Sequence, residues 1–143
     1  MIGIFLLGNA YGQNRSKEKK SSSYKIYRDR ALTSNTSALL KEANELKAND
    51  PVEALNKVQE ALGLSVAQQD EFTEAKCYVL LGEINEGIKE WKLALENYTR
   101  AYQKLTDLYI STAEYKRTLQ GLSKTNTMLD QYEDALLVSA RSL

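Results

Sequence analysis

From residue 35 onward, apolar residues recur at the three- and four-residue spacing of amphipathic helices. Apart from short β-branched pairs, no stretch alternates as a strand would, so the chain is predicted to be all-α. Asp50 fits the cap of a helix that starts at Pro51, and Asp70 and Thr73 are both candidate caps for the helix that follows. The pattern predicts six helices, near residues 35–48, 51–64, 69–87, 90–108, 111–128 and 131–142.

The same pattern contains an internal repeat. Ala54, Ala94 and Ala135 are spaced by 40 and 41 residues, and each is followed by leucine. Five positions upstream of the second and third alanines also agree in character: Tyr78 with Leu119, Leu81 with Leu122, Gly82 with Ser123, Asn85 with Asn126, and Ile88 with Leu129. A repeat of this length indicates stacked helix pairs rather than an irregular bundle.

The middle copy predicts how two of the helices pack. The small Gly82 and Ala94 allow two backbones to approach, and the large Trp91 and Tyr98 fill the space around that contact. Such an arrangement gives an antiparallel helix pair at native density. The break between the two helices is expected within residues 86–90, where Gly87 is suited to end the first helix.

The string Tyr78-x-x-Leu81-Gly82, followed by Trp91-x-x-Ala94-x-x-x-Tyr98-x-x-Ala101, resembles the tetratricopeptide repeat. The resemblance implies a right-handed superhelix, or α-solenoid, of about three antiparallel helix pairs. The repeats would span about 35–68, 69–110 and 111–143, within a domain of residues 34–143. This chain departs from the family in its period of about 40 residues, where 34 is usual.

The resemblance also implies a function and a site. Proteins of this family bind another polypeptide in the concave groove lined by the first helix of each pair. The groove has mixed charge, which suits an extended peptide with polar contacts, so the expected partner is a protein or peptide. The groove residues implied are Lys76, Val79, Glu83, Glu86, Arg117, Gln120, Lys124 and Thr127.

Composition excludes most other kinds of function. The chain has 19 basic and 19 acidic residues, which gives no overall attraction to nucleic acid. It has one cysteine and no histidine, so a Cys/His zinc site and histidine-based catalysis are both excluded. Glu83, Glu86 and Glu90 follow one helix face, as solvated glutamates often do. We therefore expect no catalytic residue, no metal site and no cofactor.

The N-terminal region differs from the rest of the chain. Residues 1–12 are apolar and end in the small residues Ala10 and Gly12, which is typical of a cleaved signal peptide, but a basic start is missing. Residues 15–30 hold seven basic and two acidic residues, a net charge of +5, and residues 13–33 are predicted to be a flexible linker. If the leader is cleaved, the protein is exported, periplasmic or membrane-associated. Otherwise it is cytoplasmic.

The last predicted helix carries Leu136, Leu137 and Val138 and lacks the polar capping helix with which repeat arrays usually finish. We therefore expect self-association through this helix, or a longer protein of which the chain is the front part. The second possibility gives the alternative function, which rests on a resemblance of long-period exported arrays to bacterial sensor proteins: an extracytoplasmic sensor-region fragment of a bacterial signal-transduction protein.

Overall fold

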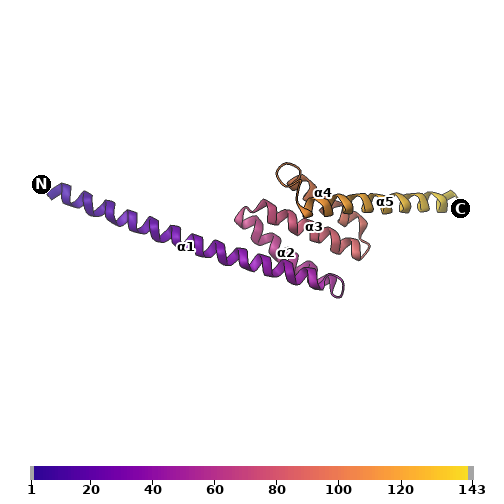
Figure 1. The fold of residues 1–143 in the computed structure, drawn as a ribbon, viewed down its shortest axis with the longest axis horizontal. Coiled ribbons are helices and arrows are strands. Elements are labelled where there is room, and N and C mark those ends of the chain that lie inside the picture. Colours follow the sequence, from indigo (N-terminus) through magenta and orange to yellow (C-terminus); the bar gives the residue numbers. More distant parts are fainter. Residues whose placement is uncertain (1, 142–143) are drawn as a thin grey trace. The chain divides into compact units, whose positions relative to one another are not determined.

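A computed structural model describes the backbone of residues 2–141 and the side chains of residues 23–141 except residue 29. The described residues form helices and no strand, which confirms the all-α prediction (Figure 1). The chain divides into two compact units, residues 1–34 and 35–143, and each is described by itself. The helices are α1 (Ile2–Leu46), α2 (Pro51–Gln68), α3 (Glu71–Gly87), α4 (Trp91–Leu105) and α5 (Ala113–Arg141).

The first unit consists of the N-terminal part of α1, which is helical from Ile2. Composition predicts a non-helical linker at residues 13–33, but the helix continues through it. The physical reason is that residues 13–49 contain neither glycine nor proline, so no residue there stops a helix. The signal peptide proposed for residues 1–12 stays a prediction.

Side-chain caps fix where two helices of the second unit begin. A carboxylate oxygen of Asp50 accepts a hydrogen bond from the backbone N–H of Glu53 at 3.1 Å, as the sequence predicts. Asp70 rather than Thr73 caps α3. Its carboxylate accepts the backbone N–H of Thr73 at 3.0 Å and the Thr73 hydroxyl at 2.6 Å. Each cap satisfies amide groups that a helix start would otherwise leave unpaired.

The ends of α2 and α3 do not depend on glycine. α2 passes through Gly63 and stops before Gln69, which adopts a left-handed conformation with φ of 57°. α3 ends at Gly87, as expected, but the residue with positive φ in the following turn is Lys89, at 63°. The short turn leads directly into α4.

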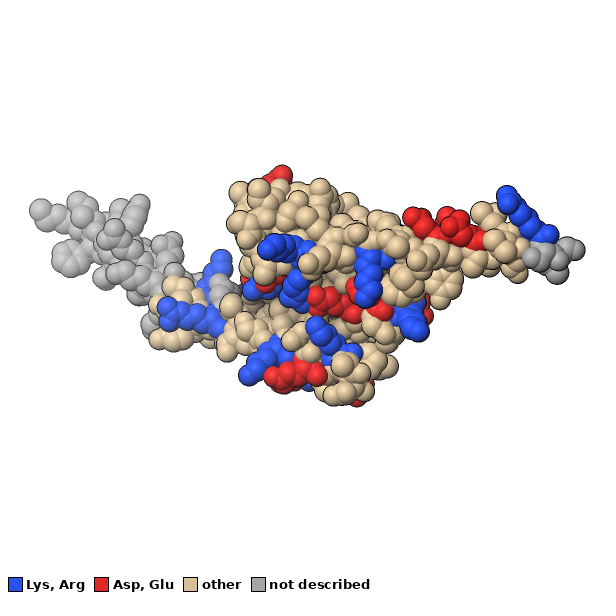
Figure 2. Space-filling model, turned by 45° about the vertical axis from the view of Figure 1, so that its right-hand side comes forward, with Lys and Arg blue, Asp and Glu red and all other residues tan. Residues whose placement is uncertain are grey.

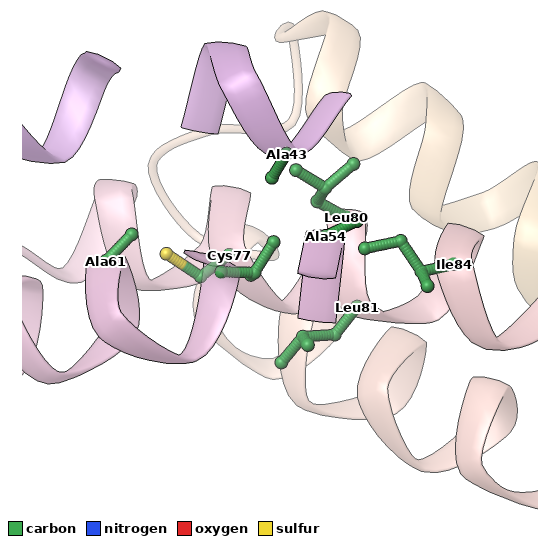
Figure 3. Packing of buried hydrophobic residues seen from close by; sticks show 8 residues of the cluster. Ala43, Ala54, Ala61, Cys77, Leu80, Leu81 and Ile84 are labelled. Carbon is green, nitrogen blue, oxygen red and sulfur yellow. The ribbon is translucent and has the colours of Figure 1, made fainter. Parts of the chain in front are cut away.

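The core of the second unit is built around α3, which packs against α2, α4 and α5. One cluster joins the end of α1 to α2 and α3, and alanines at its centre let the three helices approach closely (Figure 3). A second cluster joins α3 to α4. The buried members of the first are Ala43, Ala54, Val58, Ala61, Cys77, Leu80, Leu81 and Ile84, and those of the second are Ala75, Val79, Ala101 and Leu105.

The predicted break between a fifth and a sixth helix is wrong, because α5 is a single helix of 29 residues. The first three breaks contain a capped proline or a residue with positive φ, whereas residues 122–143 contain neither glycine nor proline. The predicted register of this segment is also shifted. Thr118, Gly121 and Thr125 are buried, while Leu119 is 42% exposed. The third helix pair is therefore not formed within the described residues.

Candidate functional site

The candidate site is a polar groove that lies along α3 between the end of α1 and the first half of α5. Most of α3 is buried by its neighbours, but Lys76, Glu83 and Glu86 keep part of their side chains at the surface. They follow each other at intervals of seven and three residues, and so share one side of the helix. This narrow stripe forms the floor of the groove.

Glu83 links three segments of the chain. Its carboxylate accepts two hydrogen bonds from the Arg117 guanidinium of α5, from Nε at 2.7 Å and from Nη2 at 2.6 Å. Lys47, in the turn after α1, is 3.4 Å from the same carboxylate. The paired carboxylate raises the pKa of Arg117 above its usual value, because it stabilises the charged guanidinium. This forked pairing fixes the direction in which Arg117 points.

Glu86 forms the second polar centre of the groove. Its carboxylate accepts the Tyr98 hydroxyl at 2.7 Å and pairs with the Lys124 ammonium group. The Tyr98 ring lies against two glycines, Gly82 of α3 and Gly121 of α5, at distances that leave no room for a β-carbon on either. Burial, and then the bond to Glu86, raise the pKa of the Tyr98 hydroxyl well above its ordinary value.

Two adjoining hollows make up the groove, and Arg117 lines both of them. On the face drawn in Figure 2, acidic side chains form a band that basic side chains flank on both sides. A hollow of about 280 Å³ is lined by Glu83, Glu86, Tyr98, Arg117, Gln120, Gly121 and Lys124. One of about 120 Å³ is lined by Leu40, Asn44, Lys76, Leu80, Glu114 and Arg117.

The structure brings together six of the eight groove residues implied by the resemblance: Lys76, Glu83, Glu86, Arg117, Gln120 and Lys124. Val79 was wrongly placed. It is 1% exposed and packs in the α3–α4 cluster, because α3 has neighbours on three sides and its exposed stripe is narrow. Thr127 is exposed but lines neither hollow, and its hydroxyl donates to the carbonyl of Ser123 at 2.9 Å.

Several groove residues were not predicted. Tyr98 was correctly assigned to the core, but its hydroxyl also reaches the groove. Leu40, Asn44 and Lys47 come from the segment where the repeat pattern is weakest, so no sequence signal pointed to them. Gly121 could have been found by comparison with Gly82, since each is a glycine inside a predicted helix, and both fit against one aromatic ring.

A larger hollow of about 440 Å³ lies between α3, α4 and the loop after α4. It is lined by Glu71, Tyr78, Arg100, Gln103, Lys104, Asp107, Leu108 and Tyr109. Both of its cations are paired nearby, Lys104 with Glu74 at 2.8 Å and Arg100 with Glu96 at 2.7 Å. None of the predicted groove residues lies in it.

Cys77 is the single cysteine of the chain, and it is buried. Burial raises the pKa of the Cys77 thiol to about 11, so it is protonated and unreactive near neutral pH. Within residues 23–28 and 30–141, no three Cys, Asp or Glu side chains are grouped so that they could hold a metal ion. None of the described helices is long and apolar enough to cross a membrane.

No known protein family, curated protein or solved structure matches this chain.

Proposed function

We propose that the protein is a non-catalytic scaffold that binds an extended segment of a partner protein in the groove between α1, α3 and α5. The observation that carries this proposal is the pair of adjoining hollows that meet at Arg117 and are lined by charged and amide side chains. As a finer proposal, the second unit is an α-solenoid of tetratricopeptide type. In that fold α1, α3 and α5 would be the first helices of successive repeats, which are the helices that line the groove.

The exposure of the charged groups favours a particular mode of binding. The Glu83 and Glu86 side chains are 20% and 18% exposed, whereas those of Lys47, Arg117 and Lys124 are 37%, 40% and 58% exposed. The carboxylates therefore form the floor and the cations form the rim. Arg117 uses only two of its five N–H donors on Glu83, so others remain for a ligand oxygen. A peptide backbone carbonyl or an acidic side chain fits these donors.

A blocking substitution tests the groove. Gln120 lines the hollow and is exposed, so Gln120→Trp should fill the space without removing an ion pair. Gln59 is an exposed glutamine on α2 that lines none of these hollows, and Gln59→Trp is the matched control. The probe is a peptide selected from a displayed library against the whole chain, labelled for fluorescence anisotropy. We expect Gln120→Trp to weaken binding at least about tenfold, which is about 1.4 kcal/mol, and Gln59→Trp to change it little. Equal affinities would place the binding surface elsewhere.

A charge exchange tests the role of Arg117 without unfolding the groove. Reversing Arg117 alone would place two carboxylates together, so loss of binding could simply reflect misfolding. The double substitution Glu83→Arg with Arg117→Glu keeps one positive and one negative group in contact but moves the cation to the floor. We expect far-UV circular dichroism to be unchanged and affinity for the same peptide to fall. Retained affinity together with retained helicity would contradict the proposed role of Arg117.

A further inference from the structure

The most strongly charged segment of the chain, residues 15–30, contributes none of the residues that line the groove. It carries seven basic and two acidic residues, a net charge of +5. The whole chain is neutral and residues 1–14 have no charge, so residues 31–143 carry a net charge of −5. Before the basic segment comes an apolar run at residues 2–7, Ile-Gly-Ile-Phe-Leu-Leu. This distribution suits a partner that offers both negative charge and an apolar phase.

The apolar run and the basic segment belong to one helix. α1 continues without a break from Ile2 to Leu46, and its residues up to 34 form a compact unit of their own (Figure 1). At 1.5 Å per residue the basic segment is about 22 Å long, and the apolar run begins about 20 Å before it. A helix pairs the backbone N–H and C=O groups within itself, which any segment that enters lipid must do. The backbone of this segment is therefore suited to contact with a membrane.

The cations described in the basic segment are not neutralised by the protein. Lys25, Arg28 and Arg30 are exposed, and none of them forms an ion pair with another residue whose side chain the structure describes. In the second unit, by contrast, six cations each pair with a glutamate: Lys47, Lys57, Arg100, Lys104, Arg117 and Lys124. The positive charge of the first unit is therefore available to an anion outside the chain.

Two exposed tyrosines of the same segment favour lipid over nucleic acid as the source of that anion. Tyr24 is 73% exposed and Tyr27 is 74% exposed. Together with Arg28 they follow the three- and four-residue spacing of one side of a helix. Tyrosine is enriched at the boundary between lipid head groups and water, because its ring is apolar and its hydroxyl is polar. Nucleic acid could pair with the cations but has no apolar phase to take up residues 2–7.

We propose that residues 2–30 of α1 bind the surface of an anionic membrane. The basic segment pairs with acidic lipid head groups, and the apolar run at residues 2–7 enters the outer part of the acyl chains. Stable attachment takes two such contributions, since a small apolar anchor without a basic cluster binds only weakly and reversibly. The second unit has a net negative charge and is repelled by the same surface, so contact is made through the first unit and the groove stays open to its partner.

Co-sedimentation of the full 16.1 kDa chain with lipid vesicles tests the proposal. Vesicles with about 30% phosphatidylglycerol in phosphatidylcholine carry negative charge, and pure phosphatidylcholine is the neutral reference. Each Lys or Arg near an anionic surface strengthens binding by roughly fivefold, so we expect the charged vesicles to bind at least about a hundredfold more tightly. Replacing three exposed cations of the segment, Lys25, Arg28 and Arg30, with glutamine should weaken this binding at least about tenfold without loss of helicity. The matched control replaces three exposed cations of the second unit, Lys41, Lys92 and Lys116, with glutamine and should change binding less than about twofold.

The apolar contribution is tested by the double variant Phe5→Ser with Leu6→Ser in the same full chain. Salt screens charges but not apolar contacts. The double variant should therefore weaken binding by a similar factor at low and high salt, whereas the effect of the three glutamines in the basic segment should shrink as salt is added. Equal binding to charged and neutral vesicles, or equal effects of the two sets of glutamines, would overturn the proposal. So would unchanged binding by the double variant, or tighter binding to a double-stranded DNA oligonucleotide than to charged vesicles at the same salt.

Discussion

Adding a single methyl group at Gly121 tests the contact on which the packing of α5 depends. The Tyr98 ring lies between Gly82 and Gly121, and a β-carbon built on Gly82 would be 2.7 Å from ring atoms Cδ1 and Cε1. A β-carbon on Gly121 would be closer still to Cζ and Cε2. Carbon atoms that are not bonded normally approach to about 3.5–4.0 Å. Since Tyr98 is 1% exposed, its ring has nowhere to move, and the helices would have to separate.

The expected magnitude follows from two opposing effects. Glycine to alanine inside a helix stabilises by about 0.5–1 kcal/mol, because the unfolded chain loses conformational freedom. Overpacking a close contact costs about 1–3 kcal/mol. We therefore expect Gly121→Ala and Gly82→Ala each to lower the free energy of unfolding by about 0.5–2 kcal/mol. Gly63 in α2 has no atom within 4 Å of such a β-carbon, so Gly63→Ala should stabilise the protein by about 0.5–1 kcal/mol.

Urea unfolding followed by far-UV circular dichroism measures all three variants under the same conditions. The decisive observation is the sign, since the same substitution should destabilise at two sites and stabilise at the third. A double variant, Gly121→Ala with Tyr98→Leu, should show a coupling energy above about 0.5 kcal/mol, because the smaller side chain makes room for the methyl group. If Gly82→Ala and Gly121→Ala stabilise the protein as Gly63→Ala does, the ring does not lie between these helices.

Three further changes should give measurable effects. Ala94 is fully buried, so Ala94→Leu should overpack the α3–α4 contact and lower thermal stability by about 1–3 kcal/mol, and an unchanged melting temperature would mean that the repeat register is wrong. Tyr98→Phe should cost about 1–2 kcal/mol in urea unfolding, because Glu86 loses a hydrogen bond from a buried hydroxyl. Burial raises the pKa of the Cys77 thiol to about 11 in the folded protein, from 9.0 when it is exposed. As the pH rises, the unfolded chain therefore loses this proton first. The free energy of unfolding should be unaffected below pH 9 and should fall by roughly 1.4 kcal/mol per pH unit between pH 9 and 11. A pH series of unfolding midpoints should be flatter for Cys77→Ala over that range, and an equal slope would contradict the burial argument.

The middle helix pair could be predicted because its signals are local. The small Gly82 and Ala94 and the large Trp91 and Tyr98 lie within one stretch of the chain, and their helical spacing alone places them on facing sides. The structure buries all four. The caps at Asp50 and Asp70 are equally local, because each carboxylate reaches only three residues along the chain. Where the residues that make a contact lie within a few helical turns of each other along the chain, the sequence alone predicts the contact.

The last helix could not be predicted in this way. Matching Ala135 to Ala94 placed Leu119 and Leu122 in the core, but Gly121 is what allows α5 to approach Tyr98, so the buried stripe lies one residue earlier. A glycine is informative only when its neighbour is known, and that neighbour is on another helix. The burial of Val79 outside the groove could not be predicted for a similar reason. Whether Val79 is exposed depends on how many helices surround α3, and no pattern within α3 itself indicates that number.

When a ligand binds in the groove it competes with the existing ion pairs, so the free energy needed to break each pair affects how the ligand binds. A partly exposed ion pair contributes about 0–1 kcal/mol, because water screens both charges. The pair of Lys124 with Glu86 is of this kind, and a ligand carboxylate could take over the ammonium group at little cost. The pair of Arg117 with Glu83 has two short hydrogen bonds, and breaking it would give up both at once, whereas Glu86 keeps the Tyr98 hydroxyl when Lys124 leaves. A ligand should therefore displace Lys124 readily but add to Arg117 through its spare donors. We therefore expect Arg117 to hold a bound peptide in one position. Lys124 should pair with an acidic side chain of the peptide where there is one, and otherwise stay with Glu86.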